Sequence, residues 1–262
     1  MTTDAEAELH RAGLADDGTP EGRRIIELLW NPGGQVHGGR GPKPRLHLED
    51  IVRAGMEIAD AGGLEQLSMR KVAAALDSGA MSLYTYVPGR AELIELMIDA
   101  AYAEHGRADP TRPWRERLEY LIRQTWALFT RHPWVLDHNQ ARLPVGPNVL
   151  DVEESLYATI AAAGFSGADN VAVANFVNWQ LLGAGRALIG DQVETRHTGV
   201  SAEEYWRARA SFWTTYFDGR RYPTMLAIWE SGGFDDDRAS SLDGIITRLI
   251  DAIDRARPAL GD

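Results

Sequence analysis

Apolar side chains recur at helical spacing along most of the chain. From Leu48 onward they fall three or four residues apart, as on one face of an α-helix, and the two-residue alternation of half-buried strands is missing. The pattern therefore predicts an all-α fold. Breaks at Gly, Pro and Asp-Ser-Gly divide it into helices expected near residues 48–62, 68–76, 80–86, 89–101, 114–131, 149–163, 168–189, 202–217, 224–230 and 240–256.

The chain before Leu48 has a different character. Residues 1–24 are polar, acidic and rich in small side chains, which predicts disorder. The apolar run 25–30 fits one or two helical turns docked on the rest of the protein. Residues 31–44 contain five Gly and three Pro, a composition typical of a flexible arm. We therefore expect a flexible N-terminal extension and basic arm over residues 1–44.

Residues 68–86, SMRKVAAALDSGAMSLYTY, have the spacing of a helix-turn-helix. Two helices that cross steeply need a small residue at the crossing, here Ala73, and apolar anchors on their inner faces, here Val72 and Leu83. The turn needs a residue that tolerates positive φ, and Asp77 can adopt it, although less readily than Gly. The second helix of such a unit can enter the major groove and present side chains to base edges.

The wider stretch from Leu48 to Met97 resembles the DNA-binding domain of the TetR family of bacterial transcriptional regulators. The matching segments are LEDIVRAGMEIADAGGLEQLSMRKVAAAL and GAMSLYTYVPGRAELIELM. The chain departs from the family pattern in the turn, where Asp77 replaces the usual Gly and Ser78 an aliphatic residue. The resemblance implies a three-helix DNA-binding domain over residues 45–92.

The resemblance also implies which residues contact DNA. Three residues that open the third helix would face the groove floor, and later side chains of that helix would contact bases or backbone. Arg70 would reach a phosphate or a base, and Arg90 would pair with a phosphate. For Met81 and Tyr84, packing against the first helix is the alternative. The residues concerned are Arg70, Ala80, Met81, Ser82, Tyr84, Thr85, Tyr86 and Arg90.

The distribution of charge along the chain also bears on DNA binding. The chain has a formal net charge of -11, so it lacks the overall basic footprint of many DNA-binding proteins. Residues 40–92, however, contain seven basic and seven acidic residues, and the rest of the chain carries the whole excess. Arg40, Lys43 and Arg45 on the arm could enter a minor groove or follow phosphates, or they could simply solvate a linker.

Residues 110–257 resemble, more weakly, the tetracycline-repressor-like C-terminal domain. The resemblance rests on HPWVLD at 132–137, RLPVGPN at 142–148, a long helix from 168 and a final amphipathic helix. It implies a ligand-binding and homodimerisation domain over residues 93–262, with dimer helices at 202–217 and 240–256. An apolar stripe in the last helix would form a four-helix interface or pack on its own domain; its members are Leu242, Ile245, Ile246, Leu249, Ile250 and Ile253.

Polar and aromatic residues that interrupt apolar faces are candidates to line a ligand pocket. Asn175 and Asn178 share a helical face with Ala174 and Leu181, and a buried amide needs a hydrogen-bond partner, which is either structural or a ligand. Core packing is the alternative for every candidate. The set is Trp126, Phe129, Trp134, His138, Asn139, Asn175, Phe176, Asn178, Trp179 and Gln180.

Catalytic and metal signatures are not found. Without Cys there is no thiol nucleophile or zinc-thiolate site, and the His spacing does not suit a metal. The GAGRALIG segment has Leu188 at the third Gly position of a dinucleotide loop, and Ser166 lacks a nucleophile elbow. No apolar run of membrane-spanning length or secretory signal is present. We therefore expect a cytoplasmic protein without catalytic residues, cofactor or membrane partner.

These observations predict a ligand-responsive, homodimeric transcriptional regulator. It would act as a repressor that binds a pseudo-palindromic operator in double-stranded DNA. A small-molecule effector would release it by favouring a conformation whose two reading helices no longer fit adjacent major grooves. The alternative is a helical small-molecule-binding protein or enzyme whose helix-turn-helix is vestigial.

Overall fold

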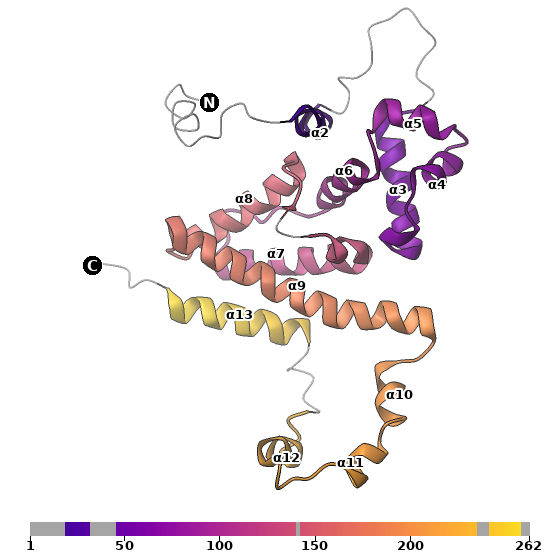
Figure 1. The fold of residues 1–262 in the computed structure, drawn as a ribbon. Coiled ribbons are helices and arrows are strands. Elements are labelled where there is room, and N and C mark those ends of the chain that lie inside the picture. Colours follow the sequence, from indigo (N-terminus) through magenta and orange to yellow (C-terminus); the bar gives the residue numbers. More distant parts are fainter. Residues whose placement is uncertain (1–18, 32–45, 140–141, 235–240, 258–262) are drawn as a thin grey trace, which may run out of the picture.

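The computed structural model describes residues 19–31, 46–139, 142–234 and 241–257. Within these ranges every regular element is helical, which confirms the predicted all-α fold (Figure 1). The α-helices are α2 (Pro20–Trp30), α3 (Leu48–Gly62), α4 (Met69–Ala75), α5 (Ala80–Tyr86), α6 (Arg90–Tyr102), α7 (Trp114–Arg131), α8 (Pro147–Ala162), α9 (Gly167–Thr198), α10 (Ala202–Arg207), α11 (Ser211–Thr215), α12 (Pro223–Glu230) and α13 (Leu242–Ala256). Two short 3-10 helices, η1 (Leu64–Gln66) and η2 (Pro133–Asp137), complete the set.

Helices α3, α4 and α5 form the helix-turn-helix domain. The Ser68 hydroxyl caps α4 by accepting from the backbone N–H of Lys71 at 3.3 Å, as the sequence predicts. Val72 and Leu83 are fully buried where α4 packs on α5. Asp77 has a φ of 47° and is the one residue other than Gly with positive φ in the described part of the chain. The expected conformation of the turn is therefore confirmed.

Helix α6 leads from the helix-turn-helix domain into a C-terminal domain built from α7, α8, α9 and α13. Helix α6 packs on α3 at one end of the molecule and on α8 further along, while α9 runs across α7 and α8 (Figure 1). Helix α9 has 32 residues and is longer than the predicted 168–189. Its last turns, residues 190–198, are mostly polar and exposed, so apolar spacing cannot reveal them.

Helix α2 corrects the expectation that the chain is flexible throughout residues 1–44. Thr19 caps the helix by accepting from the N–H of Gly22 at 3.1 Å, and Pro20 occupies the first turn. Leu28 and Leu29 are buried, and α2 lies against α6. Residues 20–24, expected to be disordered, thus belong to a packed helix because the apolar face that follows them holds the whole helix in place.

A protruding segment, residues 200–234, replaces the single helix expected at 202–217. It contains α10, α11 and α12 and extends away from the C-terminal domain (Figure 1). None of its residues is buried, so no core face supports a continuous helix through the turn at 208–210. Its aromatic side chains instead contact one another; the rings of Trp213 and Trp229 lie 4.7 Å apart between centroids.

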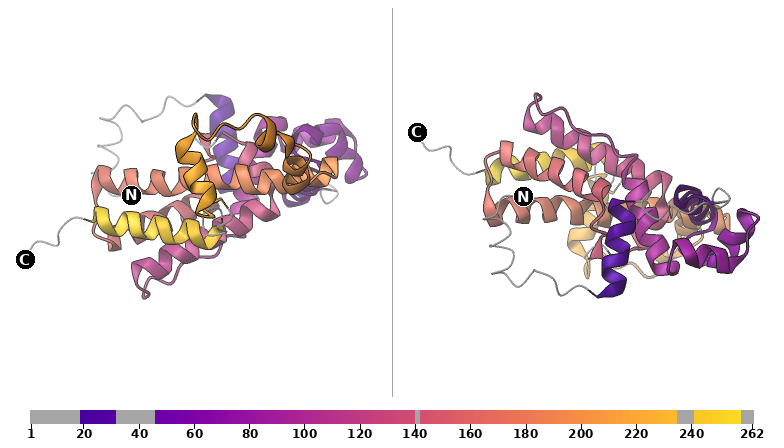
Figure 2. Two further views of the ribbon diagram at one scale, coloured as in Figure 1. Left: turned by 90° about the horizontal axis from the view of Figure 1, so that it is seen from below. Right: turned by 90° about the horizontal axis from the view of Figure 1, so that it is seen from above.

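The apolar stripe of α13 packs on its own domain in the described chain. Ile246, Leu249 and Ile253 are buried, and α13 lies against α7. Figure 2 (left), seen from below, shows α13 (yellow) across one face of the C-terminal domain. Of the two roles expected for this stripe, the structure therefore shows the packing within one chain.

In the described residues, no helix is both long and apolar enough to span a bilayer.

Candidate DNA-reading surface and ligand cavity

The outward face of α5 carries several exposed side chains. Met81 is 80% exposed, so little of it packs against the chain, whereas Tyr84 is 43% exposed and is more than half covered. Ser82 and Thr85 are exposed as well. Two further predicted contacts, Ala80 and Tyr86, are half-buried at the two ends of the helix. One face of α5 is therefore available to a groove, while Leu83 fixes the opposite face in the core.

The two predicted phosphate-binding arginines have different surroundings. Arg70 is exposed on α4 and makes no hydrogen bond or ion pair with any described residue, so its charge is available to a phosphate. Arg90 instead donates from Nε to the Leu67 carbonyl at 3.0 Å and from a terminal nitrogen to the Leu64 carbonyl at 2.6 Å. Arg90 thus ties the η1 loop to the start of α6, a role that sequence spacing did not indicate.

The remaining predicted DNA contacts fall outside the described structure. Arg40, Lys43 and Arg45 lie within residues 32–45. Their proposed approach to DNA stays a prediction based on charge alone.

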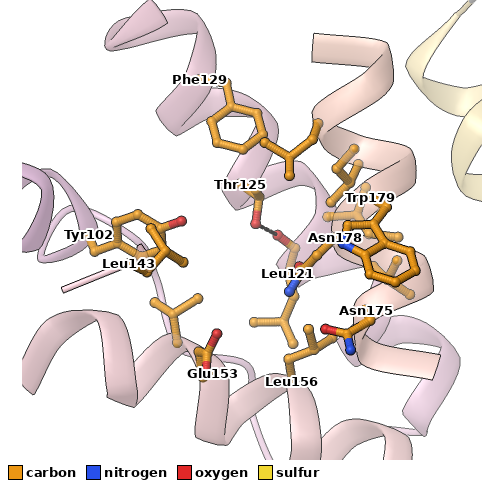
Figure 3. Close-up of a pocket in the computed structure, with 15 residues that line it drawn as sticks. Tyr102, Leu121, Thr125, Phe129, Leu143, Glu153, Leu156, Asn175, Asn178 and Trp179 are labelled. Carbon is orange, nitrogen blue, oxygen red and sulfur yellow. Dashed lines mark hydrogen bonds between the residues drawn. The ribbon is translucent and has the colours of Figure 1, made fainter. Parts of the chain in front are cut away.

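A cavity of about 110 Å³ lies between α6, α7, α8 and α9 (Figure 3). Four of the predicted pocket residues line it, namely Phe129 from α7 and Asn175, Asn178 and Trp179 from α9. These side chains were predicted because they interrupt apolar faces, and the fold brings them to one place. The other lining residues are Tyr102, Leu121, Ile122, Thr125, Leu143, Val152, Glu153, Leu156, Val177, Leu181 and Leu182.

Polar groups of the cavity wall differ in whether the protein already satisfies them. Thr125 donates to the Leu121 carbonyl at 3.0 Å, the bond drawn in Figure 3. By contrast, the hydroxyl of Tyr102 and the side chains of Glu153, Asn175 and Asn178 have no hydrogen-bond partner among the described residues, and they converge on the cavity (Figure 3). Polar groups that are partly removed from water need partners, so the wall is prepared for a polar ligand.

Tyr102 and Glu153 were missed by sequence reasoning, and their electrostatics reflect the enclosed site. Burial, and then the nearby Glu153 carboxylate, raise the pKa of Tyr102 to about 12. Burial also raises the pKa of Glu153 above its usual value. Neither residue interrupts an apolar pattern within its own helix in a way that singles it out. Only the packing of α6 on α8 places the two side chains together.

The other predicted pocket residues lie elsewhere. Phe176 and Gln180 are exposed because they occupy the opposite side of α9 from Asn178. Trp134 is buried near α3, and Nε2 of His138 donates to the Arg142 carbonyl at 2.9 Å. Neither these residues nor two further candidates, Trp126 and Asn139, line the cavity.

A second hollow, of about 820 Å³, separates the end of α3 from α9. Its wall contains a direct polar contact between the two domains. The Asp60 carboxylate on α3 accepts from the Trp134 indole N–H at 2.6 Å and lies 2.7 Å from Nδ1 of His132. On the other side, the Arg186 guanidinium on α9 donates twice to the Leu136 carbonyl, at 3.1 and 3.0 Å. The helix-turn-helix domain is therefore tied to η2, and η2 is tied to the long helix that lines the cavity.

Comparison with known proteins supports both halves of this architecture. A family model for the tetracyclin repressor-like C-terminal domain matches residues 107–248. The HTH-type transcriptional repressor DrrR1 of Streptomyces coeruleorubidus is 40% identical over 223 residues, which cover 84% of this chain and 82% of that protein.

Solved structures show the same fold. The TetR family protein ActR of Streptomyces coelicolor, in complex with (S)-DNPA, superposes with a TM-score of 0.65 at 20% identity, covering 83% of this chain and 100% of that one. BioQ, solved with its double-stranded DNA operator, has a TM-score of 0.50 at 27% identity, covering 59% of this chain and 93% of that one.

An exposed helix-turn-helix joined to a helical domain with a ligand cavity defines a ligand-responsive transcriptional regulator. The chain belongs to the TetR family, as the match over its C-terminal domain and the similarity to DrrR1 show. The relatives are transcriptional regulators, and the alternative of a protein with a vestigial helix-turn-helix is not favoured.

Proposed function

We propose that the protein is a homodimeric repressor that binds a pseudo-palindromic operator in double-stranded DNA through α5 of each subunit. A small molecule bound in the cavity between α6, α7, α8 and α9 lowers the affinity for the operator. The observation that carries this proposal is the position of α6. Its first residue, Arg90, holds the helix-turn-helix domain, and its last residue, Tyr102, lines the cavity.

The coupling follows from this shared helix. A ligand that changes the position of Tyr102 also changes the position of the end of α6 that packs on α3 and holds the η1 loop, because a helix moves as a nearly rigid rod. The ligand needs only a difference of a few kcal/mol in its affinity for the two conformations to shift the population from bound to released. BioQ is solved on its operator and ActR with a small molecule, which supports the same two partners here.

Dimerisation is part of the proposal because one short helix-turn-helix binds DNA weakly. Two such units placed one helical turn apart add their contacts. The outer face of α9 offers a suitable surface, since Phe176 and Trp179 are exposed on it and a side chain added at Gly183 would meet no atom within 4 Å. An exposed face of small and aromatic residues allows close approach of a second helix.

A binding titration of the full-length protein tests the proposal. Fluorescently labelled DNA from upstream of the protein's own gene is titrated at several salt concentrations, beside random DNA of equal length. We expect tight binding that discriminates between the two and weakens steeply with salt. Equal affinity for both DNAs would contradict the proposal.

The proposal includes no catalytic step, and it places the protein in the cytoplasm, where it can reach the chromosome.

A further inference from the structure

Of the described residues that line the cavity, Glu153 alone carries a charge. It lies on the middle of α8, half-buried, and makes no hydrogen bond or ion pair with any described residue. Asp151, on the same helix, is paired with Arg107, whereas no arginine or lysine stands on the cavity wall. A carboxylate that is partly withdrawn from water and left unpaired is costly to keep in a folded protein.

The groups around Glu153 complete a binding site for one kind of chemical group. The Tyr102 hydroxyl and the amides of Asn175 and Asn178 face the same space and offer further oxygen acceptors (Figure 3). Phe129 and Trp179 present aromatic rings to it, and the faces of such rings attract cations. Leucine and valine side chains form the rest of the wall.

We propose that the ligand of this cavity is an organic cation, an apolar body carrying a protonated amine, whose ammonium group pairs with the Glu153 carboxylate. This inference rests on the proposed function and specifies the chemical class of the effector. The ammonium group donates one hydrogen bond to Glu153 and has two further N–H groups for the Tyr102 and asparagine oxygens. The apolar body occupies the space between α7 and α9.

Other ligand charges fit the site less well. An anion would face the Glu153 carboxylate across a poorly solvated space without a compensating cation. A neutral donor such as an alcohol would make a hydrogen bond but would leave the charge uncompensated. Burial raises the pKa of Glu153, and pairing with a cation would reverse this effect by favouring the ionised carboxylate.

The size of the cavity sets the choice of probes. About 110 Å³ is close to cavities of about 150 Å³ that hold a benzene molecule. Benzylammonium, benzyl alcohol and phenylacetate share a phenyl ring and differ in charge, so the three probes isolate the contribution of charge. Their binding to the full-length protein at pH 7 is followed through the indole N–H signal of Trp179 in NMR spectra, assigned with Trp179→Phe.

We expect benzylammonium to bind about ten-fold more tightly than benzyl alcohol, as one charged hydrogen-bonded pair provides, and phenylacetate to bind most weakly. In Glu153→Gln the preference for the cation should disappear. The matched control is Glu154→Gln, which removes the same charge from the neighbouring exposed position of α8 and should keep the preference. Glu153→Met, a second neutral side chain of similar length, serves if the glutamine variant does not fold.

Three results would overturn the inference: no measurable binding of benzylammonium, equal binding of the cation and the alcohol, or a cation preference that persists in the Glu153 variants. The operator titration is carried out on the same protein. Operator discrimination together with any of these three results would reject the cationic ligand and leave the proposed repressor function standing. Loss of operator discrimination would instead reject the proposed function.

Discussion

The indole Nε1–H of Trp134 donates to Oδ1 of Asp60 at 2.6 Å, and this bond joins α3 of the helix-turn-helix domain to η2 of the C-terminal domain. His132, buried at the end of α7, approaches the same oxygen with Nδ1 at 2.7 Å. One carboxylate thus serves two buried donors of the other domain. The position of α3 is therefore fixed relative to the cavity-lining helices α7 and α9 by polar as well as apolar contacts.

Replacement of Asp60 by Ala should destabilise the protein and weaken the response to ligand. The Trp134 N–H and the His132 ring would lose their acceptor, and each unsatisfied buried donor costs about 1–3 kcal/mol. We expect the free energy of unfolding to fall by about 2 kcal/mol or more in urea denaturation. We also expect ligand to release less of the bound operator, because the two domains are no longer linked at this point.

Glu57→Ala is the matched control for Asp60. Glu57 is an exposed carboxylate on the same helix, one turn earlier. Its removal should change stability by less than about 0.5 kcal/mol, as for other surface substitutions. If the two variants behaved alike, the contact between Asp60 and Trp134 would not be the link between the domains.

Loss of Arg70 should weaken binding to all DNA sequences about equally. Its guanidinium is exposed on α4 and has no partner among the described residues, so we expect it to neutralise one phosphate in each subunit. In Arg70→Ala the slope of log affinity against log salt should become shallower by about 1.8, because the dimer loses one phosphate contact in each subunit and each contributes about 0.9. Arg112→Ala, which removes an equal charge near the start of α7, should keep the slope, and an unchanged slope in both variants would remove Arg70 from the interface.

Tyr84→Ala should lower operator affinity without affecting the fold. Tyr84 is exposed and α5 is anchored by Leu83 instead, so its removal leaves no cavity. We expect operator affinity to fall at least about five- to ten-fold through the loss of one hydrogen bond and its ring contact in each subunit, while the thermal midpoint stays unchanged. Operator affinity equal to that of the unmodified protein would show that α5 does not present this side to DNA.

Arg90→Ala, in contrast, should act mainly on the stability of the fold rather than through a lost contact with DNA. The guanidinium donates to the Leu64 and Leu67 carbonyls, and hydrogen bonds from a charged donor contribute about 1.5–3 kcal/mol. We expect a lower free energy of unfolding in urea and partial recovery in Arg90→Lys, which can keep one of the two bonds. Full stability in Arg90→Ala would mean that the residue is free to act as the phosphate contact expected from the sequence.

The residue pattern predicted most of the local structure and the helix-turn-helix, because the information there is local. Ser68 caps α4, Asp77 adopts positive φ, and Leu83 is buried, each as spacing and residue type require. The cavity was predicted less completely. Asn178 was found because it interrupts an apolar face, whereas Glu153 becomes part of the wall only through the packing of α8, which no local pattern encodes.

Because a local residue pattern does not encode tertiary contacts, some of the sequence-based expectations were wrong. The segment 202–217 begins with good helix formers, but in the described chain nothing buries its aromatic side chains, and short helices need such packing to persist. Conversely, residues 20–24 looked disordered because they are polar. Their helix forms because Leu28 and Leu29 dock on α6. Tertiary contacts decided both cases.

The outer face of α9 should form the contact between two copies of the chain. Gly183 lies exposed on this face, and a side chain there would meet nothing within 4 Å in one chain. Gly183→Leu should therefore preserve the monomer, and even favour the helix by up to about 1 kcal/mol because Gly is a poor helix former. Between two closely packed helices, the same side chain would force the backbones apart, so we expect at least a ten-fold weaker dimer by sedimentation across a range of concentrations.

Ala158→Leu, on the exposed side of α8, provides a control with a similar gain in bulk. A Gly183→Leu dimer as tight as that of the control would place the contact between the copies on another surface, with the aromatic segment 200–234 as the next one to test.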